Sequence, residues 1–126
     1  MRRRSLFAAA PVLLAAACAN EPASPVITVF FMEDSATLNA EAQDVVKAAA
    51  RRAASATGPV TVLGFAGPAG GAAYNRALSE ARAQHVADLL AANGVARDRI
   101  RIVPRGPVPF QDMPTESRRV EIRIGG

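Results

Sequence analysis

The sequence is poor in the residues that most metal sites and disulfides require. Its 126 residues include one histidine, one cysteine, one tyrosine and no tryptophan. A single cysteine excludes an intramolecular disulfide. His85 and Cys18 alone cannot supply the set of nitrogen and sulfur ligands that a structural or catalytic zinc ion needs. We therefore expect neither a metal ion nor a cofactor.

An excess of positive charge is also missing once the start of the chain is set aside. The chain has 15 basic and 11 acidic residues, and three of the basic ones are the arginines at positions 2–4, which leaves 12 against 11. The basic character therefore belongs largely to the first residues. The remainder has no electrostatic reason to bind nucleic acid.

Residues 1–17 are typical of a secretory signal peptide. The three arginines precede an uncharged run of about 12 residues, which is shorter than the roughly 20 that a membrane-spanning helix needs. Cys18 follows small residues at a position that resembles the lipobox of bacterial lipoproteins, so we expect it to be lipidated. Residues 18–25 would then be the lipidated cysteine and a short tether. An uncleaved anchor helix, or an ordinary cleavage site beside a stray cysteine, remains an alternative.

Residues 26–126 are enough for one small domain, and their hydropathy pattern predicts six elements. The order β-α-β-α-β-β predicts a two-layer α/β sandwich, with a mixed sheet covered on one face by two helices. The expected strands and helices are Val26–Phe31, a helix from an N-cap at Asn39 to Ala56, Pro59–Phe65, a helix over Ala73–Asn93 with Gly94 just after it, Arg99–Gly106 and Arg118–Ile124.

The second helix carries the most informative side chains. A rotation of 100° per residue places Leu78, His85 and Leu89 within about 20° of one direction, which predicts a core-facing stripe. Arg82 lies on the flank of this stripe. It either extends its guanidinium to water or holds an anion in a partly desolvated pocket. His85 is expected to be buried in the core or in an interface.

The loop before this helix, Gly67–Gly71, leads to a helix N-terminus, which favours carboxylates and other anions. It lacks the lysine of a phosphate-binding loop. Tyr74 and Asn75 open the helix, either as site residues or as a packing aromatic and a capping amide. Ser79 lacks the strand–turn–serine context of a nucleophile elbow. We find no catalytic constellation and expect no enzyme.

Several segments together resemble the OmpA-like C-terminal domain, the peptidoglycan-binding module of OmpA and of peptidoglycan-associated lipoprotein. The most specific one runs from Gly64 to Ala83 and reads G-F…Y-N-x-x-L-S-x-x-R-A. Supporting segments are Phe31–Leu38 and Arg118–Ile122. The resemblance covers Val26–Ile124, and the fold of that family agrees with the predicted order of elements.

This resemblance implies non-covalent binding of the diaminopimelate side chain in the peptidoglycan stem peptide. That side chain ends in an ammonium and a carboxylate group. In the family the arginine of the R-A pair takes the carboxylate, and here that residue is Arg82. Asn75 and Arg118 lie in matching segments and are further candidates for the ligand-binding site.

The sequence departs from the family at the acceptor for the ammonium group. An aspartate usually stands three residues after the strand glycine, and here that position is Gly67. Loss of a charged hydrogen-bond partner costs about 1.5–3 kcal/mol, or roughly ten- to a hundredfold in affinity. Asp34 or Glu33, from the loop after the first strand, would restore the acceptor if the fold brings either one to the site.

The sequence as a whole predicts a non-enzymatic lipoprotein of the outer membrane that faces the periplasm and links this membrane to peptidoglycan. Ala19 after the cysteine carries no inner-membrane retention signal of the aspartate kind. The alternative is a diverged domain with weakened or lost peptidoglycan binding that binds an envelope protein. An apolar cluster at Val108, Phe110 and Met113 is either such a partner surface or a loop packed on the domain.

Overall fold

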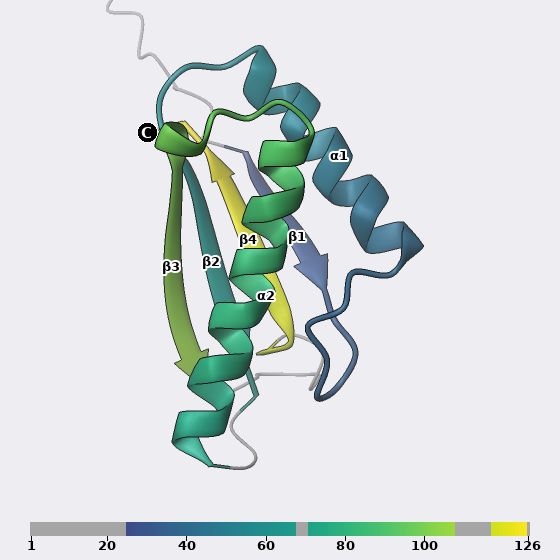
Figure 1. Cartoon of the computed structure of the whole chain (residues 1–126), viewed down its shortest axis with the longest axis vertical. Helices are drawn as coiled ribbons and strands as arrows, with labels where there is room; N and C mark the ends of the chain where they lie inside the picture. The colour runs from purple at the N-terminus through teal and green to yellow at the C-terminus, as the bar shows by residue number, and fades with distance from the viewer. Residues whose placement is uncertain (1–24, 68–70, 108–116, 126) are drawn as a thin grey trace, which may run out of the picture.

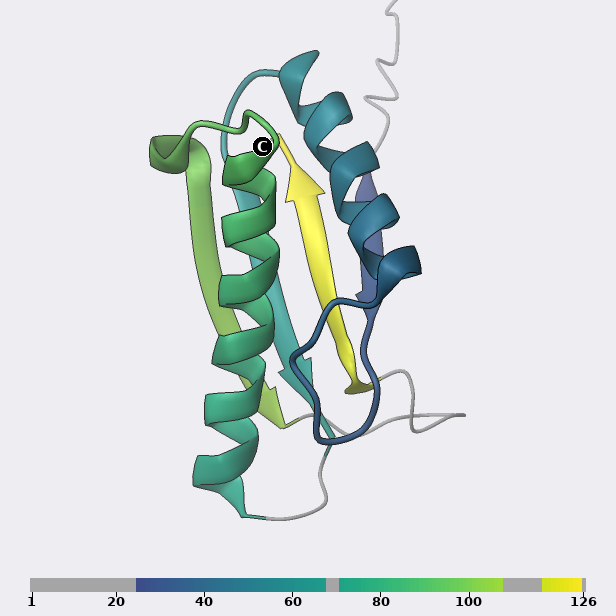
Figure 2. The same ribbon diagram turned by 45° about the vertical axis from the view of Figure 1, so that its right-hand side comes forward.

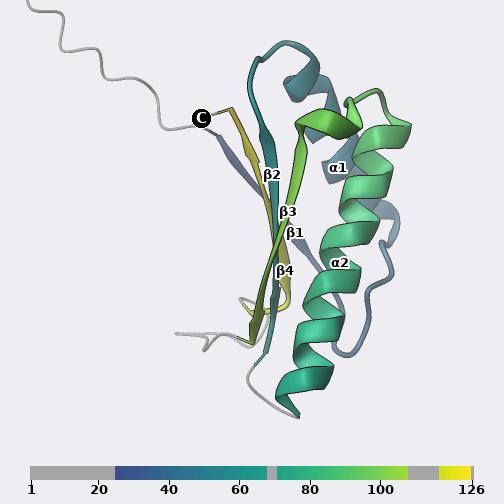
Figure 3. The ribbon, with the colours of Figure 1, turned by 60° about the vertical axis from the view of Figure 1, so that its left-hand side comes forward.

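The computed structural model describes residues 25–67, 71–107 and 117–125. The strands form one four-stranded sheet in the order β1-β4-β2-β3, in which β2 and β3 are parallel and β4 is antiparallel to both β1 and β2. Both helices cover the same face of the sheet (Figure 3). The predicted two-layer sandwich with a mixed sheet is therefore confirmed. In chain order the elements are β1 (Val26–Phe30), α1 (Ala40–Ala54), β2 (Val60–Ala66), α2 (Ala72–Ala92), the 3-10 turn η1 (Arg97–Arg99), β3 (Ile100–Pro107) and β4 (Arg119–Ile124).

α1 begins where a side chain supplies a missing backbone partner. Asn39 precedes the first turn, and its Oδ1 accepts a hydrogen bond from the Ala42 backbone N–H at 2.8 Å. The last turn carries Arg51 and Arg52, whose positive charges favour the negative end of the helix dipole. The predicted N-cap at Asn39 is confirmed.

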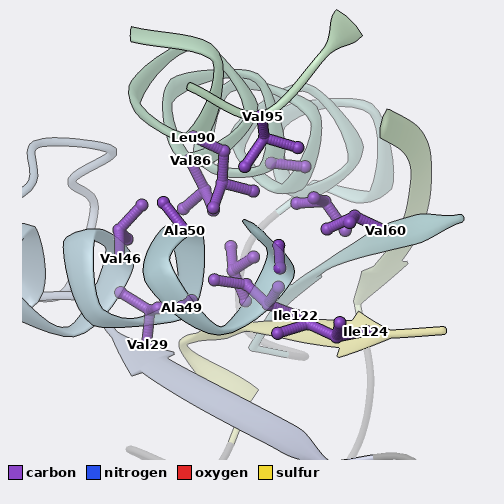
Figure 4. Close-up of a cluster of buried hydrophobic side chains, with 14 of the residues drawn as sticks. Val29, Val46, Ala49, Ala50, Val60, Val86, Leu90, Val95, Ile122 and Ile124 are labelled. Atoms are coloured by element: carbon purple, nitrogen blue, oxygen red, sulfur yellow. The ribbon is translucent and has the colours of Figure 1, made fainter. Parts of the chain in front are cut away.

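An aliphatic core fills the space between the helices and the sheet (Figure 4). Val120, Ile122 and Ile124 of β4 are all buried in it, as the alternation of charged and apolar residues predicts. α2 adds Val86 and Leu90 from the other layer. Removal of these side chains from water is the main stabilising contribution in a domain that has no disulfide.

α2 packs through a different face from the one that its leucines predict. Leu78 and Leu89 are only partly buried, and His85 is exposed. At 100° per residue, the observed and predicted directions differ by about 100°. The predicted stripe is therefore wrong, and of the two expected places for His85 the core is excluded. The buried face consists of Asn75, Ser79, Arg82, Ala83, Val86, Ala87 and Leu90.

A close approach between α2 and β2 explains this rotation. Gly64 lies under the helix, where a β-carbon would overlap the Ser79 carbonyl oxygen and come within 3.1 Å of the Ala83 Cβ. Only small side chains fit between the two backbones. The small residues at positions 79 and 83 therefore turn toward the sheet, and Leu78 and Leu89 lie at the border of the contact.

The two ends of the domain carry different parts of the chain. Val26 of β1 pairs with Arg123 of β4, so the chain enters and leaves the described fold at the same end. The last turns of both helices lie there as well (Figure 1).

No helix in the described ranges is both long and apolar enough to span a membrane. The predicted signal peptide, Cys18 and the apolar cluster at 108–113 lie outside the described residues.

Candidate functional site

The segments that carry the motif meet at the opposite end, where β1 and β2 finish and β4 begins. The loop between β1 and α1 lies beside the N-terminal half of α2 there (Figure 2). Phe31 continues beyond β1 and donates its N–H to the Arg118 carbonyl at 2.9 Å, which ties this loop to the start of β4. The predicted site residues come from these neighbouring segments: Asp34, Gly67, Asn75, Arg82 and Arg118.

Arg82 is a fully buried cation at this end of the domain, with an exposed fraction of 0 %. Its Nε donates to the Ser35 carbonyl at 2.8 Å, and its Nη2 donates to the Met32 carbonyl at 3.0 Å. Its Nη1 donates to the Phe65 carbonyl at 3.2 Å. From α2, the guanidinium therefore joins the loop after β1 to the end of β2. Of the two alternatives for Arg82, extension to water is excluded.

The surroundings of Arg82 leave positive potential available for an anion. Desolvation, and then the positive charge of Arg118, lower the pKa of Arg82, whereas Tyr74 and then Asp34 raise it. The guanidinium carbon also lies 5.3 Å from the centroid of the Phe31 ring. Two arginines near one another in a partly desolvated site favour a negatively charged ligand.

Asp34 supplies a carboxylate at the surface of the same site. Its backbone adopts a left-handed conformation, with φ of 51°, which an aspartate tolerates better than most residues. Its Oδ1 accepts a hydrogen bond from the Tyr74 hydroxyl at 3.2 Å. Partial desolvation, and then the charge and hydrogen bond of Asp34, raise the pKa of Tyr74. Because Tyr74 is 51 % exposed, it borders the site instead of packing in the core.

Glu33 adds a second, more weakly held carboxylate. It lies 3.7 Å from the Arg118 Nη1, and the Glu33 side chain is 78 % exposed. Solvent screens a pair of this kind, so it contributes little to stability. Glu33 is therefore an exposed carboxylate beside the site that is only loosely held by Arg118.

Gly67 lies close to the start of β4. A β-carbon at this position would lie 3.3 Å from the Ser117 Oγ, and Gly67 is not among the glycines with positive φ. The backbone therefore accepts a side chain after a small shift of the serine. The position is open to an aspartate, although this chain has none.

Asn75 does not cap α2. The N-cap is Gly71, which makes no side-chain hydrogen bond to the helix, and the Asn75 backbone N–H donates to the Gly71 carbonyl at 3.0 Å. The predicted capping role fails because the helix begins at Ala72, which places Asn75 inside its first turns. Asn75 belongs to the buried face that contains Arg82.

The site therefore combines buried positive charge with carboxylates at its rim. Such an arrangement suits a ligand that carries both a carboxylate and an ammonium group, because each finds an oppositely charged hydrogen-bond partner. The described residues contain no cluster of three or more histidine, cysteine or acidic side chains that could hold a metal ion.

Sequence reasoning missed two features of this end. The main-chain carbonyls that surround Arg82 have no sequence signature, because any residue provides a carbonyl. The guanidinium of Arg119 lies 4.1 Å from the centroid of the Phe65 ring, a cation–π contact that fixes the start of β4 against the end of β2. In the sequence, the pair of adjacent arginines at positions 118 and 119 was the signal that could have indicated the contact of Arg119 with Phe65.

Comparison with solved structures places this architecture among known envelope proteins. The peptidoglycan-associated lipoprotein of Burkholderia pseudomallei superposes with a TM-score of 0.69 at 22 % identity, over 76 % of this chain and 87 % of that one, and shows the shared fold. The cell wall anchor of the T6SS of Pseudomonas aeruginosa is 32 % identical with a TM-score of 0.65, over 80 % of each chain.

Sequence comparison agrees with the structural one. Outer membrane protein A of Citrobacter freundii is 38 % identical over 99 residues, which is 73 % of this chain and 42 % of that protein. Outer membrane protein 40 of Porphyromonas gingivalis is 37 % identical over 94 residues, which is 68 % of this chain and 25 % of that protein. The chain thus spans less than half the length of these curated relatives. Because the sequence model of the OmpA family matches residues 30–123, this chain belongs to the OmpA family.

Proposed function

We propose that this protein is a non-enzymatic lipoprotein that binds the peptidoglycan stem peptide and links the outer membrane to the cell wall. One observation carries the proposal. The buried guanidinium of Arg82 donates hydrogen bonds to the carbonyls of Met32 and Ser35, and Asp34 lies between these two residues in the same loop. A cation and an acceptor for an ammonium group are therefore present together. The similarity to a cell wall anchor and to a peptidoglycan-associated lipoprotein supports the same function.

The ligand that fits this pair is the end of a diaminopimelate side chain. Its carboxylate would bind between Arg82 and Arg118, and its ammonium group would bind Asp34, which Tyr74 orients. A guanidinium has five N–H donors, and the three hydrogen bonds of Arg82 to main-chain carbonyls leave two for a ligand. In this role Asp34 takes the place of the aspartate that the family usually has at the position of Gly67.

Access to Arg82 requires a local movement. The guanidinium has no exposed surface, and two of its three carbonyl partners belong to the loop that contains Met32 and Ser35. An outward shift of this loop would expose the two N–H groups of Arg82 that the carbonyls leave free, and an entering carboxylate would accept hydrogen bonds from them. Arg82 would keep hydrogen-bond partners throughout, so the free-energy cost is small compared with that of exposing an unpaired charge.

The positions of the chain ends suit a tether. The described chain starts at the end of the sheet opposite the loop between β1 and α1 (Figure 1), and this loop supplies two of the carbonyl partners of Arg82. α2 has 21 residues and, at 1.5 Å per residue, a length of about 30 Å. A lipid on Cys18 would thus hold the domain by one end, and the proposed wall-binding site would point away from the membrane.

Substitution of Asp34 by asparagine tests the proposal without disturbing the fold. Asparagine keeps the shape, tolerates the left-handed backbone and accepts the Tyr74 hydrogen bond, but it removes the charge. We expect Asp34→Asn to weaken sedimentation with purified peptidoglycan by roughly ten- to a hundredfold in affinity. Asp44→Asn, on the exposed face of α1, is the matched control and should bind like the unmodified protein. Equal binding by both variants would show that Asp34 does not take part in the binding of peptidoglycan.

One observation favours the alternative, a diverged domain that serves as a periplasmic protein-interaction module. Gly67 leaves the usual acceptor position without a side chain. Under this alternative the unmodified protein fails to sediment with peptidoglycan, whereas Gly67→Asp restores sedimentation. The same assay therefore separates the two functions.

A further inference from the structure

The end of the domain away from the candidate site presents a group of exposed arginines. Arg51 and Arg52 lie in the last turn of α1, and Arg101 lies near the start of β3. None of these three arginines forms an ion pair with another described residue. By contrast, Arg97 at the same end pairs with Asp88 at 3.2 Å. The arginines at 51, 52 and 101 form what we call the basic end.

The C-terminus of α1 does not offset this positive charge. The last carbonyls of a helix normally carry partial negative charge. Here Arg99 donates from its Nε to the Gly58 carbonyl at 3.0 Å, and from Nη1 and Nη2 to the carbonyls of Ala53 and Ala56 at 3.1 and 3.2 Å. Arg99 thereby satisfies the end of the helix and fixes the turn into β2, which leaves the exposed arginines to act outward.

Two shallow hollows lie beside this turn. Arg51 and Arg52 border a hollow of about 540 Å³ whose walls include Pro25 and Ile124. Arg101 borders a second hollow of about 410 Å³, which meets the first at Ala56. Small and apolar walls with basic rims suit a phosphate group that is attached to a less polar stem.

The acidic side chains and the arginines of α1 lie in opposite halves of the helix. On α1, Glu41 and Asp44 lie in the first half of the helix, toward the candidate site, whereas both arginines lie in the last turn. Asp98 borders the second hollow and is the one acidic residue among those that line the two hollows. The helix is therefore polarised along its length, and positive charge gathers where the chain enters the domain.

We propose that the basic end is a membrane-facing surface that binds the headgroups of anionic phospholipids in the bilayer that holds Cys18. The inference rests on the lipid anchor of the proposed function. Cys18 stands seven residues before Pro25, and at about 3.5 Å per residue this connection cannot exceed roughly 25 Å. The anchor confines the basic end to a layer in which the attraction of arginine to an anionic surface acts over a Debye length of about 8 Å.

The distance between this end and the bilayer can be measured on the full, lipidated chain in vesicles. The lipid occupies the sulfur of Cys18, so Thr57→Cys, in the exposed turn after α1, provides a single thiol for a fluorophore. Energy transfer to an acceptor on the lipid headgroups would be compared in phosphatidylcholine vesicles with and without phosphatidylglycerol. We expect stronger transfer with phosphatidylglycerol, reduced by added salt.

A charge-reversal pair with a matched control assigns the effect to the basic end. Arg51→Glu/Arg52→Glu should lower the equilibrium constant for docking of the basic end on the bilayer by at least about fivefold for each arginine. Energy transfer should then fall to the level seen with phosphatidylcholine vesicles. Arg76→Glu/Arg105→Glu removes the same charge from the other end of the domain, where both residues border a different hollow, and should leave the transfer unchanged.

Three results would overturn the inference. Equal transfer in the two kinds of vesicle would show that anionic headgroups are not bound. Equal losses in the two charge-reversal pairs would show a general effect of net charge. Failure of the unmodified chain to float with vesicles would contradict the lipid anchor, and this surface with it. Peptidoglycan sedimentation is measured separately, so failure of wall binding is distinguishable from each of these results.

Discussion

At the scale of single residues, Arg82 connects stability with the proposed binding. Its three bonds to carbonyls hold the loop after β1 against the end of β2. We expect Arg82→Ala to lower the free energy of unfolding by roughly 3 kcal/mol, because buried carbonyls lose charged donors. Urea unfolding measures this loss, with Arg76→Ala, an exposed arginine of the same helix, as the control. If both variants unfold at the same urea concentration, the contacts of Arg82 are not stabilising.

Gly67 is the position at which a single substitution should strengthen binding. A carboxylate there would give the ammonium group a second acceptor, and the backbone accommodates the side chain beside Ser117. We expect Gly67→Asp to raise the affinity for peptidoglycan by about tenfold. Gly71→Asp adds the same charge to the same loop, where a β-carbon meets no atom within 4 Å, and should leave the affinity unchanged. Equal affinities for Gly67→Asp and the unmodified protein would show that this position does not face the ligand.

The candidate site could be predicted from the sequence only in part. The motif identified Arg82, and the loop composition identified Asp34 as a possible acceptor. The carbonyls of Met32, Ser35 and Phe65 could not be predicted, because they come from main-chain atoms far from Arg82 in sequence. Their positions depend on the packing of α2 and not on local residue preferences.

At the scale of secondary-structure elements, the contact between α2 and β2 determines which side of the helix faces the core. We expect Gly64→Ala to destabilise the domain by about 3 kcal/mol, because the new methyl group overlaps the Ser79 carbonyl and forces the backbones apart. Thermal unfolding measures the effect. Gly71→Ala is the control, since nothing lies within 4 Å of a β-carbon there. Equal melting temperatures for Gly64→Ala and Gly71→Ala would contradict the close approach of α2 to β2.

The same contact explains where the sequence was informative about elements and where it was not. The alternation in Arg119–Ile124 and the capping side chain of Asn39 are local signals, and both predicted the structure. In α2, apolar and small residues surround much of the helix, so the leucines at 78 and 89 indicated the wrong side. Steric fit against Gly64 determines which side of α2 faces the core. A single sequence does not show which strand a helix will pack against.

At the scale of the whole molecule, nearly balanced charge is distributed unevenly. The chain from Cys18 onward has 12 basic and 11 acidic residues, yet three arginines without an ion pair to another described residue gather at the end where the described chain begins. The candidate site at the other end combines buried arginine with exposed carboxylates. The proposed function requires two surfaces of different chemistry, one toward the membrane and one toward the cell wall, and the two ends of the domain differ in this way.

The most direct test of the account compares two peptidoglycans in one sedimentation experiment with the unmodified protein. Stem peptides with lysine in place of diaminopimelate keep the ammonium group and lack the terminal carboxylate, which is the group assigned to Arg82 and Arg118. We predict binding to diaminopimelate-type peptidoglycan and roughly ten- to a hundredfold weaker binding to the lysine type. Equal binding to both types, or binding to neither, would contradict the proposal that this end of the domain recognises diaminopimelate.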